Sequence, residues 1–274
     1  MSITVCNFTN VYENQPFMEG LRHSGEAIWI DCTDIPGTDC YCDDEAVEAI
    51  CRRIADAGIT DAQGIHFIDN GNYHYMSKLW TDRIAEPFTL VVFDHHPDMQ
   101  EPRFGDILSC GGWVKKVLNE NKFIDNVVLI GVADHLVDEI CEELSQADDA
   151  EILDKVTFIR ESEIDTLSSL VCSELASVLS SKLYISIDKD ALSPAYAATN
   201  WDQGSLDVAL LKNIITNLAA NHKILGIDIC GERARDFSGD EHHTVQEADA
   251  LNNELNRDLL DFVTQQVDKL SINP

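Results

Sequence analysis

The sequence has few basic residues. Lys and Arg number 19 against 49 Asp and Glu, so the formal net charge of the 274 residues is −30 at pH 7. Nucleic acids are bound through clusters of Lys and Arg, so this balance argues against a nucleic-acid partner. The acidity suits a small cationic substrate, which a negative field concentrates, and it equally suits a role in solubility alone. Both explanations stay open at this stage.

Long apolar runs are also missing. No stretch approaches the roughly 20 residues of a membrane span, and the first residues lack the basic start and long apolar core of a signal peptide. We therefore expect a cytoplasmic protein with no membrane partner. No internal repeat, low-complexity tract or Pro/Ser-rich linker interrupts the chain, and its length fits a single domain over residues 1–274.

The cysteines do not form a recognisable framework. There are nine, an odd number, and without a secretory signal they are expected to be reduced thiols. Cys32, Cys40, Cys42 and Cys51 lie close together in the sequence, but they lack the CxxC pairs typical of a structural zinc site. The pattern therefore favours neither disulfides nor structural zinc.

Apolar, β-branched runs alternate with helical patterns almost throughout the chain. The predicted strands cover residues 3–8, 27–32, 64–69, 88–94, 126–132, 155–160, 183–188 and 224–229. The predicted helices cover residues 43–57, 74–84, 111–121, 135–146, 162–180, 206–220 and 245–269. Such alternation is typical of βαβ units, so we expect an α/β fold with a mostly parallel sheet of eight strands and helices on both faces.

Ionisable residues follow five of these predicted strands. In an open parallel sheet, ligands bind beyond the carboxyl ends of the strands, so these residues mark the expected site. The segments are Asp69 to His74, Asp94 to Asp98, Asp134 to His135, Asp188 to Asp190, and Asp228 to Glu232. Their distribution predicts that one edge of the sheet carries the function.

Two of these segments have the spacing of metal ligands. Asp94, His96 and Asp98 are spaced two apart after an apolar strand, and Asp188 and Asp190 repeat the pattern. Side chains two apart in an extended segment share a face, so each set can converge on one point. The complete predicted ligand set is His74, Asp94, His96, Asp98, Asp188 and Asp190.

This ligand set has the chemistry of a two-cation site. Four carboxylates match the charge of two divalent ions. Mixed oxygen and nitrogen ligation without thiolate favours borderline-hard cations such as Mn²⁺ over structural zinc. Without metal, the aspartates would repel one another and their pKa values would rise. We therefore predict two Mn²⁺ ions, with other divalent metals as alternatives.

The same segments resemble the ureohydrolase family of arginase, agmatinase and relatives. Asp94–Asp98 is similar to the family's Asp-Ala-His-x-Asp signature. Ser186–Pro194 is similar to its Ser-x-Asp-x-Asp-x-x-Asp-Pro signature, with Ser193 in place of the last aspartate. Gly71–His74 resembles a Gly-Gly-Asp-His element. The resemblance spans about residues 64–235.

The resemblance implies a three-layer α/β/α fold with a binuclear manganese centre. It implies that a bridging hydroxide attacks a guanidinium-type carbon and that Asp98 orients this hydroxide. It also implies an assignment of ligands: Asp94 and Asp188 bridge the ions, His74 and Asp98 complete one site, and His96 and Asp190 complete the other.

The substrate-facing residues of the family carry over less cleanly. Arginases have a proton-shuttling histidine on the loop after the Asp-x-His-x-Asp motif, and Cys110 stands near that position here. Cys110 is therefore a candidate catalytic proton donor or substrate contact, or it merely fills space as buried cysteines often do. Four histidines are candidate substitutes for the shuttle or ordinary surface residues: His95, His135, His242 and His243.

Two acidic residues are candidates for contact with the substrate. The family's guanidinium-binding glutamate comes three residues after an aspartate, but here Gly231 holds that place and Glu232 follows. A bulge at Gly231 would aim Glu232 at the substrate through charge-assisted hydrogen bonds; the alternative is a surface carboxylate. Asp134 resembles an aspartate in the family's Gly-Leu-Arg-Asp loop, with Ala133 in place of the arginine.

The resemblance thus predicts a metal-dependent hydrolase that cleaves a C–N bond of a guanidino or amidino compound. Two alternatives remain: a metal-binding family member without this activity, and a single-zinc amide deacetylase of the same fold. The residues that hold the amino-acid end of arginine are not recognisable, which disfavours arginine as the substrate. Members of the family often form trimers or hexamers, so a homo-oligomer is possible.

Overall fold

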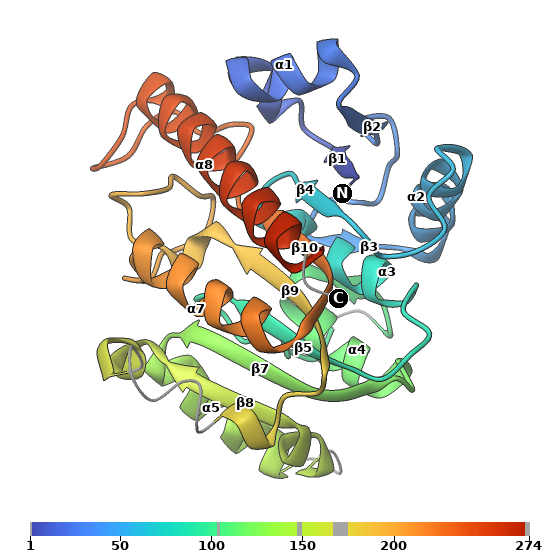
Figure 1. The fold of residues 1–274 in the computed structure, drawn as a ribbon, viewed down its shortest axis with the longest axis vertical. Coiled ribbons are helices and arrows are strands. Elements are labelled where there is room, and N and C mark those ends of the chain that lie inside the picture. The colour runs from blue at the N-terminus through green and yellow to red at the C-terminus, as the bar shows by residue number, and fades with distance from the viewer. Residues whose placement is uncertain (1, 103–104, 147–149, 167–174, 272–274) are drawn as a thin grey trace.

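The computed structural model describes residues 2–102, 105–146, 150–166 and 175–271. Its centre is an eight-stranded sheet in which each pair of neighbouring strands is parallel (Figure 1). The strand order is β2-β1-β4-β10-β9-β5-β7-β8. The strands are β1 (Ile3–Asn7), β2 (Ala27–Asp31), β4 (Ile65–Ile68), β5 (Phe88–Phe93), β7 (Ile124–Val132), β8 (Val156–Arg160), β9 (Lys182–Asp188) and β10 (Lys223–Cys230). The eight predicted strands are confirmed.

Helices cover both faces of this sheet and make the three-layer α/β/α architecture (Figure 1). One face packs against α2 (Asp44–Asp56), α3 (Met76–Thr81), α4 (Trp113–Glu120) and α5 (Asp134–Gln146). The other packs against α1 (Pro16–Ser24), α7 (Val208–Asn221) and α8 (Val245–Ser271). The predicted fold class is therefore confirmed.

Burial on two faces explains the apolar composition of the central strands. All six residues of β5 are buried, as are the last six of β9. A strand covered on both faces reads as a continuous apolar run, because neither face meets water. Trp80 on α3 and Trp113 on α4 are fully buried against the sheet, and each such side chain contributes roughly 1.5–3 kcal/mol through its burial.

Three local elements differ from the sequence-based expectation. Helix α1 was not predicted, although Pro16 at its first turn and Gly25 at its left-handed end (φ 73°) are ordinary helix-boundary signals. Strands β3 (Tyr41–Cys42) and β6 (Leu108–Ser109) form an antiparallel ribbon that is too short to show a periodicity. The helix predicted over 162–180 falls partly outside the described residues, and its described flanks are 3₁₀ turns.

Across the ranges that the structure describes, no helix is both long and apolar enough to cross a bilayer.

The strand order decides which loops meet. Strands β5 and β9 are direct neighbours in the sheet, with Phe93 opposite Ile187. The residues that follow, Asp94 and Asp188, therefore leave the sheet side by side at its carboxyl edge. Two segments nearly a hundred residues apart in sequence are brought together in this way.

Candidate metal centre

All six predicted metal ligands line one cavity at the carboxyl edge of the sheet. Its volume is about 80 Å³. The residues that line it are Gly71, His74, Asp94, His96, Pro97, Asp98, Gln100, Cys110, Gly111, Asp188, Asp190 and Trp201. The topology thus assembles the whole set that the spacing of the motifs suggested.

Short turns after the strands aim these side chains. Asp188 ends β9 and caps the 3₁₀ turn Lys189–Ala191, because its Oδ1 accepts the amide hydrogen of Asp190 at 3.0 Å. His74 follows a second 3₁₀ turn, Gly71–Tyr73. Asp98 has φ 49°, in the left-handed region that non-glycine residues seldom adopt. Backbone strain of this kind concentrates at functional sites.

The side chains form two groups of potential ligand atoms. In the first, Nδ1 of His74 lies 3.2 Å from Asp94 Oδ2 and 3.3 Å from Asp188 Oδ2. In the second, Nδ1 of His96 lies 3.0 Å from Asp190 Oδ2 and 3.5 Å from Asp94 Oδ1. Within each group the ligand atoms lie within 4.8 Å of one another. Asp94 belongs to both groups and directs one oxygen into each.

Asp98 stands beside the first group rather than in either. Its Oδ2 lies 3.1 Å from His74 Nδ1 and accepts a hydrogen bond of 2.7 Å from the indole nitrogen of Trp113. Trp113 begins α4 and is fully buried, so it holds this carboxylate in a fixed position.

Outer hydrogen bonds orient the two imidazole rings. Nε2 of His74 lies 2.9 Å from Ser186 Oγ, and Nε2 of His96 lies 3.0 Å from Asp202 Oδ1. Both rings therefore present Nδ1 to the cavity. Metal-ligating histidines usually engage their second nitrogen in this way, which fixes the tautomer and the ring plane. Sequence reasoning missed Asp202, because no spacing rule links it to His96.

The electrostatics of the cluster fit a pair of divalent cations. Asp94 Oδ2 is buried and has no hydrogen-bond partner. Burial and then the charge of Asp190 raise the pKa of Asp188 to about 7, and burial and then the charge of Asp94 raise the pKa of Asp190 to about 6. Buried carboxylates that crowd together need a compensating positive charge. The donor set therefore suits metal ions, and His74, Asp94, Asp188, His96 and Asp190 are the residues that would hold them.

The two histidines respond to the same negative charge. Burial lowers the pKa of His74, but the nearby carboxylates of Asp94 and Asp98 outweigh burial and raise it well above its usual value. For His96, burial likewise lowers the pKa, and the hydrogen bonds to Asp190 and Asp94 raise it by more. Without metal, the imidazolium ions supply part of the positive charge that the cluster requires.

Cys110, the candidate proton donor, is one of the residues that line the cavity. It lines the cavity and forms a hydrogen bond with the thiol of Cys40. That hydrogen bond, followed by burial, raises the pKa of the Cys110 thiol far above its usual value. The side chain therefore stays protonated at neutral pH.

Glu232, the expected substrate contact, is not among the residues that line the cavity. It is fully buried and belongs to a separate network. Lys189 donates a hydrogen bond to Oε1, Asn256 donates to the same oxygen at 2.8 Å, and Gln15 donates to Oε2 at 2.7 Å. Both carboxylate oxygens are thus satisfied.

The backbone explains why a glutamate does not stand one position earlier. Gly231 has φ 95°, and a Cβ there would come within 2.3 Å of Asp188 Oδ1 and 2.8 Å of the amide of Lys189. Only glycine fits beside the turn that carries the metal ligands. The bulge that would aim Glu232 at the cavity is not formed, because the carboxylate turns toward Lys189 instead.

Asp134, the second expected substrate contact, is also not among the residues that line the cavity. It begins α5, and its oxygens accept hydrogen bonds from the hydroxyl (2.6 Å) and the amide (3.2 Å) of Ser162. These bonds to Ser162 lower the pKa of the Asp134 carboxyl. The four candidate replacements for the proton shuttle do not line the cavity either: His95, His135, His242 and His243.

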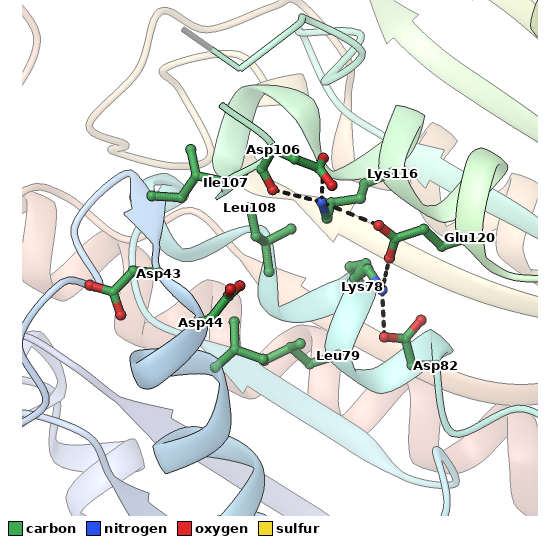
Figure 2. Close-up of a pocket in the computed structure, with 11 residues that line it drawn as sticks. Asp43, Asp44, Lys78, Leu79, Asp82, Asp106, Ile107, Leu108, Lys116 and Glu120 are labelled. Atoms are coloured by element: carbon green, nitrogen blue, oxygen red, sulfur yellow. Dashed lines mark hydrogen bonds and ion pairs between the residues drawn. The ribbon is translucent and has the colours of Figure 1, made fainter. Parts of the chain in front are cut away.

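A larger cavity of about 570 Å³ lies between α2, α3 and α4. Figure 2 shows that its two lysines are each held by carboxylates: Lys116 bridges Asp106 and Glu120, and Lys78 bridges Glu120 and Asp82. No histidine lines this cavity. The smaller cavity is the better candidate site, because it contains both groups of potential metal ligands.

Comparison with known proteins identifies the family. A family model described as the arginase family matches residues 19–234. The chain belongs to the arginase family. An uncharacterized protein from Thermotoga maritima is 31% identical over 169 residues, which are 62% of this chain and 58% of that protein. The match thus spans a little over half of that relative's length.

Solved structures of arginase-family proteins share the fold. A hypothetical agmatinase from Burkholderia thailandensis has a TM-score of 0.61 at 16% identity, covering 98% of this chain and 87% of that one. An arginase from Bacillus subtilis also has a TM-score of 0.61 at 16% identity, covering 95% and 98%. At such identities the likeness concerns the fold, and it confirms the predicted architecture.

Proposed function

We propose that this arginase-family protein is a binuclear metal-dependent hydrolase that cleaves a C–N bond of a guanidino or amidino compound. The observation that carries the proposal is the position of Asp94, whose two oxygens serve two adjacent His/Asp groups. A pair of divalent cations there, Mn²⁺ in our proposal, supplies activated water near neutral pH and stabilises negative charge on the reacting oxygen.

The chain's own residues take the remaining roles. Asp98, held by Trp113 and by its left-handed backbone, orients the attacking water. The thiol of Cys110 lines the same cavity, and in our proposal it donates a proton to the departing nitrogen. This assignment places the acid on the loop where arginases have a histidine.

The cavity favours a small planar cation. Its wall is rich in carboxylates, and Trp201, 42% exposed, lies at its rim. The indole nitrogen of Trp201 donates a hydrogen bond of 3.1 Å to Asn72 Oδ1, which fixes the ring. A guanidinium or amidinium group stacks favourably on such an indole face. In our proposal Trp201 takes part of the recognition that Glu232 does not provide.

The test is hydrolysis by the full-length protein loaded with Mn²⁺. Agmatine, arginine, guanidinobutyrate and formimidoyl-glutamate are supplied in turn, and urea, ammonia and formamide are measured. We expect turnover of at least one of them, with arginine the poorest, and no turnover by Asp94→Ala. Inertness of the metal-loaded protein toward every compound would refute the proposal and favour a metal-binding protein without this activity.

The deacetylase alternative is weaker. A single-zinc mechanism has no use for a second His/Asp group, whereas the cavity contains two, and the family match favours the ureohydrolases. We further propose that the protein works in the cytoplasm on a small cationic substrate, without nucleic-acid or membrane partners. Formation of a homo-oligomer is tested by light scattering of the purified chain.

A further inference from the structure

The ribbon of β3 and β6 places two cysteines near each other beside the metal cavity. In its register Tyr41 pairs with Ser109, and Cys42 pairs with Leu108. Cys40 and Cys110 adjoin the same end of this ladder: Cys40 has a left-handed backbone (φ 59°), Cys110 begins a 3₁₀ turn, and the amide of Cys110 donates a hydrogen bond of 2.9 Å to the carbonyl oxygen of Cys40.

We propose that Cys40 and Cys110 are a redox modification site, whose thiols a peroxide oxidises reversibly to a disulfide that restricts the metal cavity. Opposed residues of an antiparallel pair, such as the neighbouring Tyr41 and Ser109, have Cα atoms about 4.5–5.5 Å apart, and a disulfide spans about 4.4–6.8 Å. The bond therefore forms without a large movement of the backbone.

Accessibility separates this pair from the buried cysteines. Cys40 and Cys110 are both partly exposed, as are Cys51 and Cys141, whereas Cys6, Cys32, Cys42 and Cys230 are buried. The hydrogen bond from Cys110 lowers the pKa of the Cys40 thiol, whereas burial raises the pKa of the Cys32 and Cys42 thiols to about 12. Thiolates are the reactive form, so Cys40 is the thiol that attacks the oxidant.

The chemistry balances with peroxide as the oxidant. The Cys40 thiol loses its proton, and the thiolate attacks one peroxide oxygen, breaks the O–O bond and becomes a sulfenic acid; the departing hydroxide takes up the released proton as water. The Cys110 thiol then displaces the hydroxyl group of that sulfenic acid, which forms the S–S bond and releases a second water. Two thiols lose two electrons to one peroxide. A dithiol reductant returns both electrons and restores the thiols.

A disulfide between Cys40 and Cys110 would affect the metal cavity, because the ribbon adjoins its wall. One end of the ribbon contributes Cys110 and Gly111 to the wall of the metal cavity. The carbonyl oxygen of Gly111 accepts the amide hydrogen of Gln100, another lining residue. A disulfide draws Cys110 toward Cys40, fixes this wall and removes the proton that the Cys110 thiol would donate. This last effect rests on the proposed function, whereas formation of the bond does not.

The primary test uses the full-length, Mn²⁺-loaded protein and no substrate. One equivalent of hydrogen peroxide is added, free thiols are alkylated, and peptides are analysed by mass spectrometry. We expect a peptide containing Cys40 linked to one containing Cys110, with the link lost after dithiothreitol. Cys40→Ser abolishes the link, whereas Cys51→Ser, which removes a partly exposed thiol on α2, preserves it. Absence of the link, or linkage of Cys110 to another cysteine, overturns the proposal.

Two further readouts test the restriction of the cavity. Oxidised protein should retain its Mn²⁺ yet release it to a chelator more slowly than reduced protein, and an unchanged release rate would overturn the restriction. On any amidine that is hydrolysed, oxidation should lower turnover about 100-fold, the scale of a lost general acid. Because metal release needs no substrate, failure of the proposed function leaves this test intact.

Discussion

Two buried ionic clusters share the turn Lys189–Ala191 and its cap, yet they differ in how their charges are met. On one side, Asp188 and Asp190 face the metal cavity, where Asp94 Oδ2 has no hydrogen-bond partner. On the other side, Lys189 is buried and pairs with Glu232.

The difference separates a functional cluster from a structural one. Around Glu232, one ammonium group and two amides satisfy the carboxylate completely. Around Asp94, the carboxylates outnumber the cations that the chain supplies, and burial and then the charge of Asp190 raise the pKa of Asp188. A buried carboxylate therefore marks a ligand site only where its own chain fails to satisfy it, and the following experiments test this distinction.

The largest effect on stability is expected at the satisfied cluster. Glu232→Ala leaves the Lys189 ammonium buried and unpaired, which should lower the free energy of unfolding by about 3–5 kcal/mol. Urea denaturation measures this loss, and elemental analysis should find the metal content unchanged. If the variant were as stable as the wild type but lost turnover, Glu232 would instead be a residue that contacts the substrate.

Removal of the shared carboxylate should have the largest effect on metal. Asp94→Ala should weaken the binding of both ions by more than about 100-fold, beyond the effect expected of an outer partner. Asp188→Ala should also cost more metal than His74→Ala, as expected of a bridging ligand. Calorimetric titration with Mn²⁺ measures each affinity. Equal losses in all three variants would contradict the assignment of Asp94 and Asp188 as bridging ligands.

A smaller effect is expected from removal of the Asp202 carboxylate, which lies beside Nε2 of His96. Asp202→Ala frees Nε2 of His96 and should weaken one ion by about 10–100-fold, with the other ion little changed. Asp207→Ala on the same loop region is the matched control, because Asp207 caps α7 instead. If both variants bind metal like the wild type, Asp202 does not orient His96.

The smallest expected effect is a pH dependence. The stability of the metal-free protein should fall as the pH rises, whereas its affinity for Mn²⁺ should rise. The pKa values of Asp188 and Asp190 are raised to about 7 and about 6, so the folded metal-free protein holds protons there that the unfolded chain has released. Its stability should therefore fall as the pH rises from about 4 through 7. Metal must displace these protons, so Mn²⁺ affinity should rise over the same range.

Thermal unfolding with and without Mn²⁺ at several pH values measures this linkage. The stabilisation by metal should grow as the pH rises from 5 to 8, values that span the raised pKa values by about one unit. Metal stabilisation that is independent of pH would show that the aspartates are already ionised, and hence that the cluster is not strained.

The sequence predicted the strands and the candidate metal ligands from short-range patterns. Continuous apolar runs mark buried strands. The extended alternation expected after them is not formed, because bends at His95 and His96 and a left-handed Asp98 take its place, yet Asp94, His96 and Asp98 still line one cavity. The position of the Glu232 side chain could not be predicted from such patterns, because it depends on Gln15, 217 residues earlier in the chain. The position of Asp134 likewise depends on a distant residue, because its carboxylate accepts a hydrogen bond from the hydroxyl of Ser162.

Short elements were missed for a different reason. The ribbon that sets Cys40 near Cys110 has two residues in each strand, so it shows no alternation in the sequence. Asp202 supports His96 across the mouth of the cavity from a loop without regular structure. The sequence thus predicted the six candidate ligands that the structure brings to one cavity, whereas the contacts that orient and flank them required the structure.

The most direct test of a two-cation centre is a count of metal ions in the native chain. Full-length protein is stripped with a chelator, dialysed and titrated with Mn²⁺, and the bound metal is measured by elemental analysis alongside calorimetry. We predict two ions per chain in the wild type, with both lost from Asp94→Ala. Uptake of no ion, or of one ion that survives Asp94→Ala, would contradict the account.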